Sequence, residues 1–276
     1  MNARLEDRTA LVTGAARGIG RATALKLASE GAAMVLCDLD EDALKDTASA
    51  IEENGGSAVT CAGNLTEPGF PDQLIDAAIE NTGGLDIIVN NAGYIWNSAI
   101  HNHTDEQWQA MLDIHATAPF RLLRAFAPWL RETAKREIEA SGHARCRKVV
   151  NISSVSGTTG SPTQIGYSAG KAAVVGITKT LAKEWGRYNV TVNCVAFGHI
   201  ETRLTQPYKD APPIIEVEGR AHRVGLSEAQ IEAVKRSAAL GRSGTPDDAA
   251  GAIYLFCIPE SDYITGEILT CSGGTI

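Results

Sequence analysis

TGAARGIG, at residues 13–20, joins an apolar run at 9–12 to a helical pattern at 19–29, and this stretch decides the fold. Its glycines let backbone N–H groups approach a pyrophosphate, and the positive end of the following helix dipole favours the same anion. A tight strand-to-helix turn without a ligand is the alternative interpretation of such a motif alone. The spacing Gly-xxx-Gly-x-Gly predicts a dinucleotide-binding turn.

Short apolar runs alternate with helix-length patterns along the whole chain. Continuous apolar strands separated by helices are typical of a parallel sheet covered on both faces. We therefore expect an α/β fold, a single-domain doubly wound (Rossmann) parallel sheet with helices on both faces, over residues 1–276. The expected strands are 9–12, 33–37, 57–61, 87–90, 148–153, 191–196 and 268–271, and the clearest expected helices are 19–29 and 41–53.

Three helix starts carry local signals. Thr104 with Gln107, and Ser227 with Gln230, have the spacing of capping boxes, in which hydroxyl and amide satisfy free N–H groups. Pro246 suits the first helical position, where its missing N–H costs nothing. These signals predict helices that begin just after Thr104 and Ser227, and at Pro246.

Three segments look like additions to, or edges of, this plan. The charged segment 133–148 is expected to extend a helix into solvent, and its end, 145–148, to be a solvated start of a strand. Residues 203–240 hold three prolines before the helix that follows Ser227. A long segment of this kind in a compact domain is typical of a binding loop, so we expect a substrate lid at about 203–240.

Length and composition bound the kind of protein. The chain has 276 residues, and its formal net charge is −8, from 25 Lys plus Arg against 33 Asp plus Glu. An acidic chain without a basic face is a poor binder of nucleic acid or anionic lipid. Residues 1–7 carry no apolar run, no stretch approaches the ~18 apolar residues of a membrane span, and the six cysteines are scattered. We therefore expect a cytoplasmic protein without nucleic-acid or membrane partners.

Asp38 closes the second expected strand, 24 residues after Gly14 (38 − 14). A carboxylate there accepts hydrogen bonds from both adenosine ribose hydroxyls and repels a 2′-phosphate, which favours NAD over NADP. Arg17 is the contrary signal, because a guanidinium near the ribose pairs well with that phosphate. Leu39, not a second cation, follows Asp38, so we expect NAD as the cofactor and regard NADP as the alternative.

Tyr167 and Lys171 are four residues apart, on one face of an expected helix. A free tyrosine has a pKa of ~10 and is a weak base at neutral pH, but a neighbouring ammonium, together with an oxidised nicotinamide, favours the phenolate and lowers that pKa. Ser154 ends an expected strand and is placed to donate to a substrate oxygen. Taken one at a time, these residues are not diagnostic, because a tyrosine and a lysine at helical spacing are more often an ordinary surface pair.

Together these motifs resemble those of the short-chain dehydrogenase/reductase (SDR) family of NAD(P)-dependent oxidoreductases. The similarity covers nearly the whole chain, and the motifs occur in the family's order. They are TGAARGIG at 13–20, NNAG at 90–93, ISS ending at Ser154, YSAGK at 167–171 and GHIET at 198–202. GRSGTPDDAA and YITGEILTCSGG resemble the family's usual ending.

The resemblance implies hydride transfer between NAD(H) and a secondary alcohol or ketone, with Tyr167 as general acid/base. It implies that Ser154 steadies the developing alkoxide, and that Lys171 binds the nicotinamide ribose and lowers the pKa of Tyr167. The expected cofactor-binding residues are Gly14, Arg17, Gly18, Ile19, Gly20, Asp38, Leu39, Asn64, Leu65, Asn90, Ala92, Gly93, Tyr167, Lys171, Ile200 and Thr202.

His115 departs from the family's pattern, because the family's fourth catalytic residue is an asparagine. In the family that residue acts largely through its backbone carbonyl, which holds a proton-relaying water, so His115 stays a catalytic candidate. The alternative is a histidine that only packs a helix. Phe197 and Ser272 stand where the family commonly has proline and aspartate, and they leave the substrate undetermined.

The substrate pocket is expected to be partly apolar, which suits a 3-oxoacyl thioester, a steroid, a cyclic alcohol or a modified sugar. Its expected lining is Tyr94, Ile95, Trp96, Ser156, His199, Ile214, Ile215 and Val217. His101 and His103 have no nearby third ligand, so no metal site is expected.

Three functional hypotheses remain open. The first is an NAD-dependent dehydrogenase or reductase of a small-molecule alcohol or ketone. The second is a non-catalytic NAD-sensing regulator, which the His115 substitution favours. The third is an NADPH-dependent 3-oxoacyl-(acyl-carrier-protein) reductase. Family members commonly form dimers or tetramers, and a helix at 104–131 carries apolar residues that suit a homo-oligomer contact or the core: Phe120, Leu123, Phe126 and Trp129.

Overall fold

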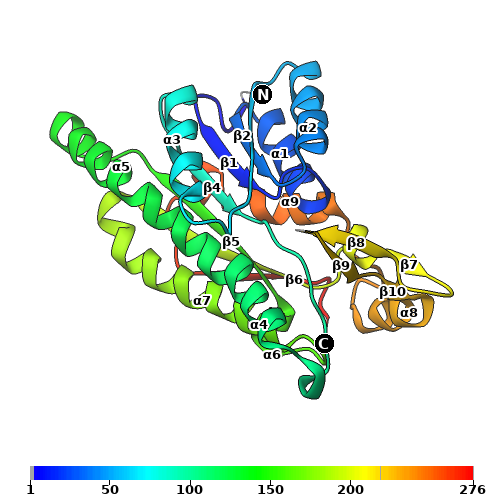
Figure 1. Cartoon of the computed structure of the whole chain (residues 1–276). Coiled ribbons are helices and arrows are strands. Elements are labelled where there is room, and N and C mark those ends of the chain that lie inside the picture. The colour runs from blue at the N-terminus through cyan, green and yellow to red at the C-terminus, as the bar shows by residue number, and fades with distance from the viewer. Residues whose placement is uncertain (1–2, 218, 276) are drawn as a thin grey trace.

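Seven parallel strands form the central sheet of the computed structural model, which describes residues 3–217 and 219–275. The strand order is β3-β2-β1-β4-β5-β6-β11, and each neighbouring pair is parallel (Figure 1). The strands are β1 (Thr9–Thr13), β2 (Ala33–Asp38), β3 (Ala58–Ala62), β4 (Ile87–Asn90), β5 (Arg147–Ser154), β6 (Val190–Phe197) and β11 (Ile268–Cys271). The order reverses between β1 and β4, where sheets of this kind bind ligands at the strands' carboxyl ends.

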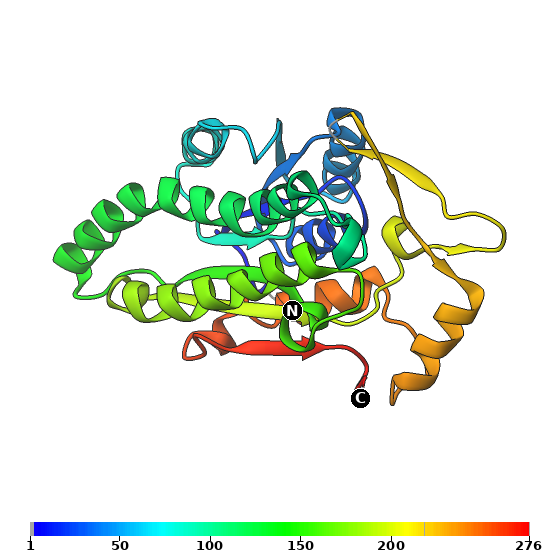
Figure 2. The same cartoon turned by 60° about the horizontal axis from the view of Figure 1, so that its bottom comes forward.

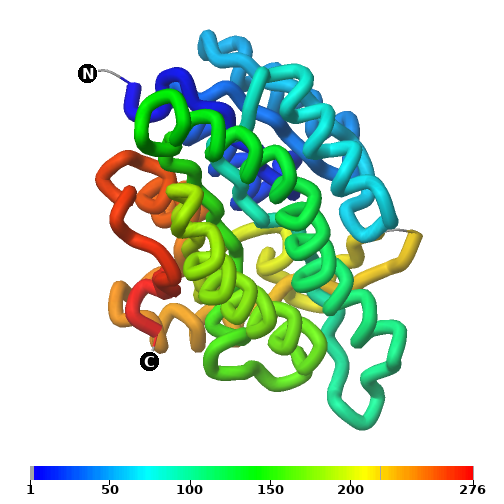
Figure 3. Tube along the Cα trace, turned by 90° about the vertical axis from the view of Figure 1, so that its left-hand side faces the viewer, coloured from blue at the N-terminus to red at the C-terminus, as the bar shows by residue number. Residues whose placement is uncertain are grey.

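Helices cover both faces of the sheet. One face carries α1 (Gly18–Ser29), α2 (Glu41–Glu53) and α9 (Pro246–Tyr254), and the other carries α3 (Phe70–Thr82), α5 (Ala118–Ser141) and α7 (Ile165–Trp185). Figure 3 shows the last three side by side on one side of the molecule. The doubly wound α/β fold expected from the sequence is confirmed.

The two faces have separate cores, and β1 shows how the strands serve both. Ala10 and Val12 lie in the core beneath α1, whereas Leu11 lies in the core beneath α5. All three side chains are fully buried, which explains why the strand is continuously apolar and does not alternate with polar residues.

The expected strands all occur, with ends within one residue of the expected ones. The side chains of Thr104 and Ser227 cap α4 (Asp105–Leu112) and α8 (Glu228–Ser237) through complete capping boxes. The helix expected at 104–131 occurs and runs without a break from Asp105 to Ser141, but a π-helical turn at Asp113–Thr117 divides it into α4 and α5. Of its four apolar residues, Leu123 and Phe126 belong to the core and Phe120 is 49% exposed.

The charged segment before β5 is less solvated than expected. α5 does extend outward, but it ends at Ser141, and the strand start at 145–148 is partly buried. Arg147 is 3% exposed and lies 2.7 Å from Glu137, and Lys148 is 4% exposed and lies 2.6 Å from Asp262. The expectation of a solvated run is wrong for both residues, because each cation is paired with a carboxylate.

The segment 203–240 packs outside the central sheet (Figure 2). It holds the short pair β7 (Pro207–Tyr208) and β10 (Leu226–Ser227), the hairpin of β8 (Ile214–Val217) and β9 (Arg220–Arg223), and α8. Across the described residues, no helix combines the length and apolar character needed to cross a bilayer. The same residues form no group of three or more metal-ligating side chains.

Candidate active site

The turn between β1 and α1 has the shape that the glycine motif predicts. Gly14 adopts φ +66°, and a Cβ there would lie 2.8 Å from the Cα of Ala92. A Cβ on Gly20 would lie 1.9 Å from the carbonyl oxygen of Gly14, a separation that only glycine allows. Arg17, the N-cap residue, makes no side-chain hydrogen bond to the first turn of α1. The glycines therefore allow the turn to pack tightly against the segment after β4, at the start of a helix whose first backbone N–H groups can bind an anion such as a pyrophosphate.

Asp38, at the end of β2, lies against this turn. Its Oδ2 accepts a hydrogen bond from the Ala16 N–H (3.0 Å), and its Oδ1 accepts one from the Asp40 N–H (3.2 Å). Burial raises the pKa of the Asp38 carboxyl, and the hydrogen bond from Ala16 opposes that shift. Arg17 forms an ion pair with Asp40, so its guanidinium already has a carboxylate partner.

The segment after β6 reaches the same turn. Ile200 is buried, and the side chain of Thr202 packs against the turn. Arg203, which sequence analysis missed, lies close enough to Arg17 and Asp38 for both charges to act on it. Burial lowers the pKa of Arg203, the charge of Arg17 lowers it further, and that of Asp38 opposes the shift. The sequence did hold a signal for Arg203, because this cation directly follows Thr202, an expected cofactor-binding residue.

Buried polar side chains tie the NNAG segment to the sheet. Asn90 Nδ2 donates to Asn151 Oδ1 (2.8 Å), which links β4 to β5. The hydroxyl of Thr13 accepts from the backbone N–H groups of Asn91 and Ala92, at 3.0 and 3.1 Å. Thr13, Asn91 and Asn151 were not predicted as site residues. They shape the crevice by fixing the segment after β4 against the end of β1.

Three predicted cofactor residues lie after β2 and β3. Leu39 is 49% exposed and follows Asp38 directly. Asn64 Oδ1 accepts from the backbone N–H of Thr66 (2.9 Å), and Leu65 packs into the core under α3 and α5. The contacts of these three residues with adenine stay a prediction.

Ser154, Tyr167 and Lys171 come together at the carboxyl end of β5. Ser154 is the last residue of that strand, its hydroxyl donates to the Phe197 carbonyl (3.3 Å), and it lies near enough to Tyr167 to act on the ionisation of that phenol. Lys171 lies one turn after Tyr167 in α7, with its Nζ 5.8 Å from the centre of the tyrosine ring. The ammonium donates to the carbonyl of Ile152 at 2.8 Å, which holds it at the strand end.

Burial sets the ionisation of these groups. It raises the pKa of Tyr167, and the hydrogen bond with Ser154 opposes the shift. It lowers the pKa of Lys171 to about 8, so the lysine is mostly protonated at neutral pH. Within the protein alone, burial outweighs the groups that favour the phenolate, and the lowering expected from Lys171 together with an oxidised nicotinamide stays a prediction.

His115 also belongs to this cluster. It is 2% exposed, and its Nε2 lies 2.8 Å from the carbonyl oxygen of Tyr94. Its ring stands perpendicular to that of Tyr167, with the two centroids 5.0 Å apart. Burial and the charge of Lys171 hold the pKa of His115 well below its ordinary value, so the imidazole is neutral.

The hairpin of β8 and β9 packs over the expected pocket residues. His222, in β9, is 1% exposed and stands edge-on to the rings of Tyr94 and Trp96, at centroid distances of 5.0 and 4.7 Å. Val217, in β8, packs against the cluster that contains Tyr94 and the catalytic candidate tyrosine. Ile214 is 66% exposed, so its expected place in the lining is wrong. Sequence analysis missed His222.

A cleft of about 650 Å³ lies between the segment after β6 and α8. His199, Thr202 and Arg203 line it from the segment after β6, and Ile231 and Lys235 line it from α8. Its lining includes neither the glycine turn nor Ser154, Tyr167 and Lys171. The arrangement suits a nucleotide-dependent enzyme, with a glycine turn at a helix start, the partly buried carboxylate of Asp38 and a tyrosine–lysine pair at one edge of a parallel sheet.

Comparison with known proteins agrees with this class. Residues 8–213 match the sequence model of the short chain dehydrogenase family. A 3-oxoacyl-acyl-carrier-protein reductase of Thermotoga maritima is 31% identical and one of Synechocystis sp. is 35% identical. The alignments cover 99% of this chain in both cases, and 99% and 98% of those proteins. A crystal structure of a short chain dehydrogenase from Burkholderia cenocepacia in complex with NADP has a TM-score of 0.82 and 27% identity, over 99% of each chain.

The chain belongs to the short-chain dehydrogenase/reductase family. It is accordingly an oxidoreductase of a family that uses NAD(P). The predicted family and enzyme class are confirmed, and the hypothesis of a non-catalytic regulator finds no support in these relatives.

Proposed function

We propose that this chain transfers hydride between NAD(H) and a secondary alcohol or ketone, with Tyr167 as the general acid/base. The observation that carries the proposal is the gathering of Ser154, at the end of β5, with Tyr167 and Lys171, one helical turn apart in α7, at the same sheet edge as the glycine turn. When bound, the nicotinamide supplies or accepts the hydride.

Each side chain then has a distinct task. Tyr167 gives its hydroxyl proton to the carbonyl oxygen in reduction and takes a proton from the alcohol in oxidation. Ser154 donates to the same oxygen and stabilises the charge that develops there. Lys171, held by the carbonyl of Ile152, presents its remaining N–H groups to the ribose hydroxyls and favours the phenolate.

The test is Tyr167→Phe, which removes only the hydroxyl. We expect the rate with a responsive alcohol or ketone to fall by about 10²- to 10⁴-fold, the usual contribution of general acid/base catalysis. Affinity for the reduced cofactor, measured by its fluorescence, is expected to change little. A panel of alcohols and ketones, followed by nicotinamide absorbance in both directions, supplies the substrate. Full activity of the variant would overturn the role of Tyr167.

We further propose that NAD is preferred over NADP. Asp38 is held by two backbone N–H groups and offers its remaining lone pairs to the ribose hydroxyls, and Arg17, the cation expected to attract a 2′-phosphate, is paired with Asp40. We expect tighter binding of NADH than of NADPH, and a loss of that preference in Asp38→Ala. Tighter binding of NADPH by the unchanged protein would contradict the proposal, and the NADP complex of the Burkholderia relative makes this measurement necessary.

A second candidate is an NADPH-dependent 3-oxoacyl-(acyl-carrier-protein) reductase. Two relatives that align over almost the whole chain carry that name. A 3-oxoacyl thioester therefore belongs in the substrate panel, with each cofactor. Turnover of the thioester with NADPH, and not with NADH, would select this candidate over the first.

We also propose that residues 1–276 form one domain with 203–240 as its substrate lid, and that the protein is a cytoplasmic homo-oligomer, a dimer or a tetramer. The exposed side chains of Trp108 and Phe120, 38% and 49% exposed on α4 and α5, support the oligomer. Light scattering during size-exclusion chromatography measures the mass of the particle in solution. A mass equal to that of one chain would contradict the proposed homo-oligomer.

A further inference from the structure

His115 is held by a hydrogen bond that fixes its tautomer. Its Nε2 lies 2.8 Å from the carbonyl oxygen of Tyr94, and a carbonyl only accepts. The hydrogen therefore sits on Nε2, and in the neutral ring Nδ1 carries the lone pair. Nδ1 is buried and makes no hydrogen bond within the described part of the chain.

Two glycines make room for this ring. A Cβ on Gly93 would lie 2.4 Å from Cε1 of the imidazole, and a Cβ on Gly170 would lie 2.8 Å from the His115 Cβ. The ring is also perpendicular to that of Tyr167, 5.0 Å away. It thus occupies a closed position between the segment after β4 and helix α7, in contact with the general acid/base.

We propose that His115 is a positioning residue that acts through its imidazole and not only through its backbone. Its Nε2–H holds the Tyr94 carbonyl, and its ring edge fixes the tilt of the Tyr167 phenol. The proposal rests on the proposed function, because the residue it positions is the proposed acid/base. The neutral ring in one tautomer exchanges no proton with substrate.

Two substitutions separate the hydrogen bond from simple packing. His115→Gln keeps an N–H donor at the position of Nε2, and His115→Phe keeps the ring volume without a donor. Leaving a buried acceptor unpaired lowers the equilibrium constant that favours the native arrangement of the site by roughly tenfold to a hundredfold. We expect kcat of His115→Phe to fall by that factor, and that of His115→Gln to stay within about fivefold of the wild type. The dissociation constant of NADH is expected to stay unchanged in both.

The opposite order overturns the proposal. If the residue only fills space, His115→Phe retains full kcat and His115→Gln is the slower enzyme. If it acts only through its backbone carbonyl, both variants that fold retain kcat. Circular dichroism and thermal melting establish which variants fold.

A second measurement needs no turnover. NMR of isotope-labelled histidine reports the tautomer, and we expect His115 to stay neutral with its hydrogen on Nε2 from about pH 5 to about pH 8. A ring that titrates in this range, or carries its hydrogen on Nδ1, overturns the proposal. This result is independent of whether any substrate is found, so it separates failure of this inference from failure of the proposed function.

Gly170→Ala tests the same contact from the α7 side. The new methyl group would meet the His115 Cβ at 2.8 Å and displace the ring, so we expect kcat to fall as in His115→Phe. Gly176→Ala is the matched control in the same helix, because a Cβ there meets nothing within 4 Å. Equal activity of the two glycine variants would show that the ring position does not matter for the reaction.

Discussion

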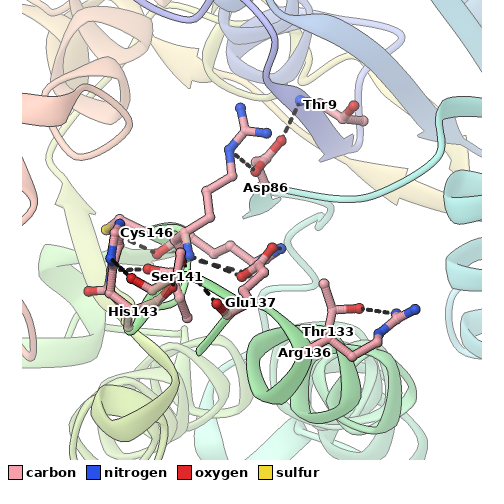
Figure 4. A network of polar contacts seen from close by, with 12 residues as sticks. Thr9, Asp86, Thr133, Arg136, Glu137, Ser141, His143 and Cys146 are labelled. Atoms are coloured by element: carbon pink, nitrogen blue, oxygen red, sulfur yellow. Dashed lines mark hydrogen bonds and ion pairs between the residues drawn. The ribbon is translucent and has the colours of Figure 1, made fainter. Parts of the chain in front are cut away.

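The two edges of the parallel sheet differ in whether their charged side chains have partners of opposite charge. At the amino-terminal edge, Asp86 receives guanidinium groups of Arg8 (3.2 Å) and Arg145 (3.1 Å) and the backbone N–H of Thr9 (3.0 Å). Figure 4 shows Asp86 with Thr9, and the second carboxylate of this edge, Glu137, among its own partners. Every one of these buried or half-buried charges meets an opposite charge.

At the carboxyl-terminal edge, Lys171 is buried without an ionic partner among the described residues, whereas Asp38 is partly buried with the charges of Arg17 and Arg203 nearby. Lys171 is 5% exposed, and within the described residues it enters no ion pair and donates only to a backbone carbonyl. Burial lowers its pKa to about 8, and burial raises the pKa of Asp38. Displaced pKa values of this kind concentrate where a ligand or a reaction completes the charge balance. One edge is therefore built for stability and the other for binding.

The largest expected effect belongs to Asp86→Ala. It leaves two guanidinium groups and a backbone N–H without their acceptor, and breaking such a pair costs about 3 kcal/mol of unfolding free energy. Urea denaturation measures the loss, and kcat is expected to stay within about twofold because the site lies at the opposite edge. Asp86→Asn, which keeps an acceptor for the Thr9 N–H, should lose less. A large drop in kcat at unchanged stability would break the division between the edges.

Lys171→Met is expected to raise stability while it removes activity. The pKa of Lys171 is about 8 in the folded state against 10.5 when free, so folding at pH 7 costs up to about 3 kcal/mol to bury the charge. In the variant the Ile152 carbonyl loses its donor, which lowers the unfolding free energy by about 1–2 kcal/mol. The net gain in unfolding free energy is therefore about 1–2 kcal/mol.

The sign of this effect follows from linkage. The penalty is fully present below pH 8, where both states hold the proton, and it fades as pH rises from about 8 toward 10.5, because the folded state releases its proton first. We therefore expect the melting temperatures of the variant and the wild type to converge in that window. A variant less stable than the wild type at pH 7 would mean that the lysine is not strained by burial.

Sequence alone predicted the sheet and the glycine turn because their determinants are local. The strand at Ile87–Asn90 is apolar and flanked by loops, and the capping box at Thr104 spans only four residues. The π-helical turn around His115 could not be predicted, since its side chain bonds to Tyr94, 21 residues earlier in the chain. Arg147 and Lys148 looked solvated because the sequence does not show which carboxylates fold next to them.

The site follows the same rule. The residues of short motifs, such as Ser154, Tyr167 and Lys171, were predicted together, and the structure brings them together. His222 and Arg203 were missed because both lie in the segment 203–240, where no periodic pattern places a side chain. Their positions depend on how a segment outside the sheet folds back over it.

The smallest expected effect concerns that segment. Arg220 of the lid hairpin lies 3.1 Å from Glu106 of α4 and 5.8 Å from the centre of the Trp96 ring. Both charged side chains are largely exposed, so the ion pair contributes about 0.2–1 kcal/mol.

Glu106→Gln should therefore loosen the lid without affecting either edge of the sheet. We expect the KM for the carbonyl or alcohol substrate to rise by about two- to fivefold, with kcat and the melting temperature unchanged. High salt should bring the wild-type KM close to that of the variant, because salt screens an exposed pair. A fall in kcat instead would mean that the ion pair between Arg220 and Glu106 influences the position of Tyr167. The hairpin of β8 and β9 would then have to be counted with the carboxyl-terminal edge of the sheet as part of the reacting site.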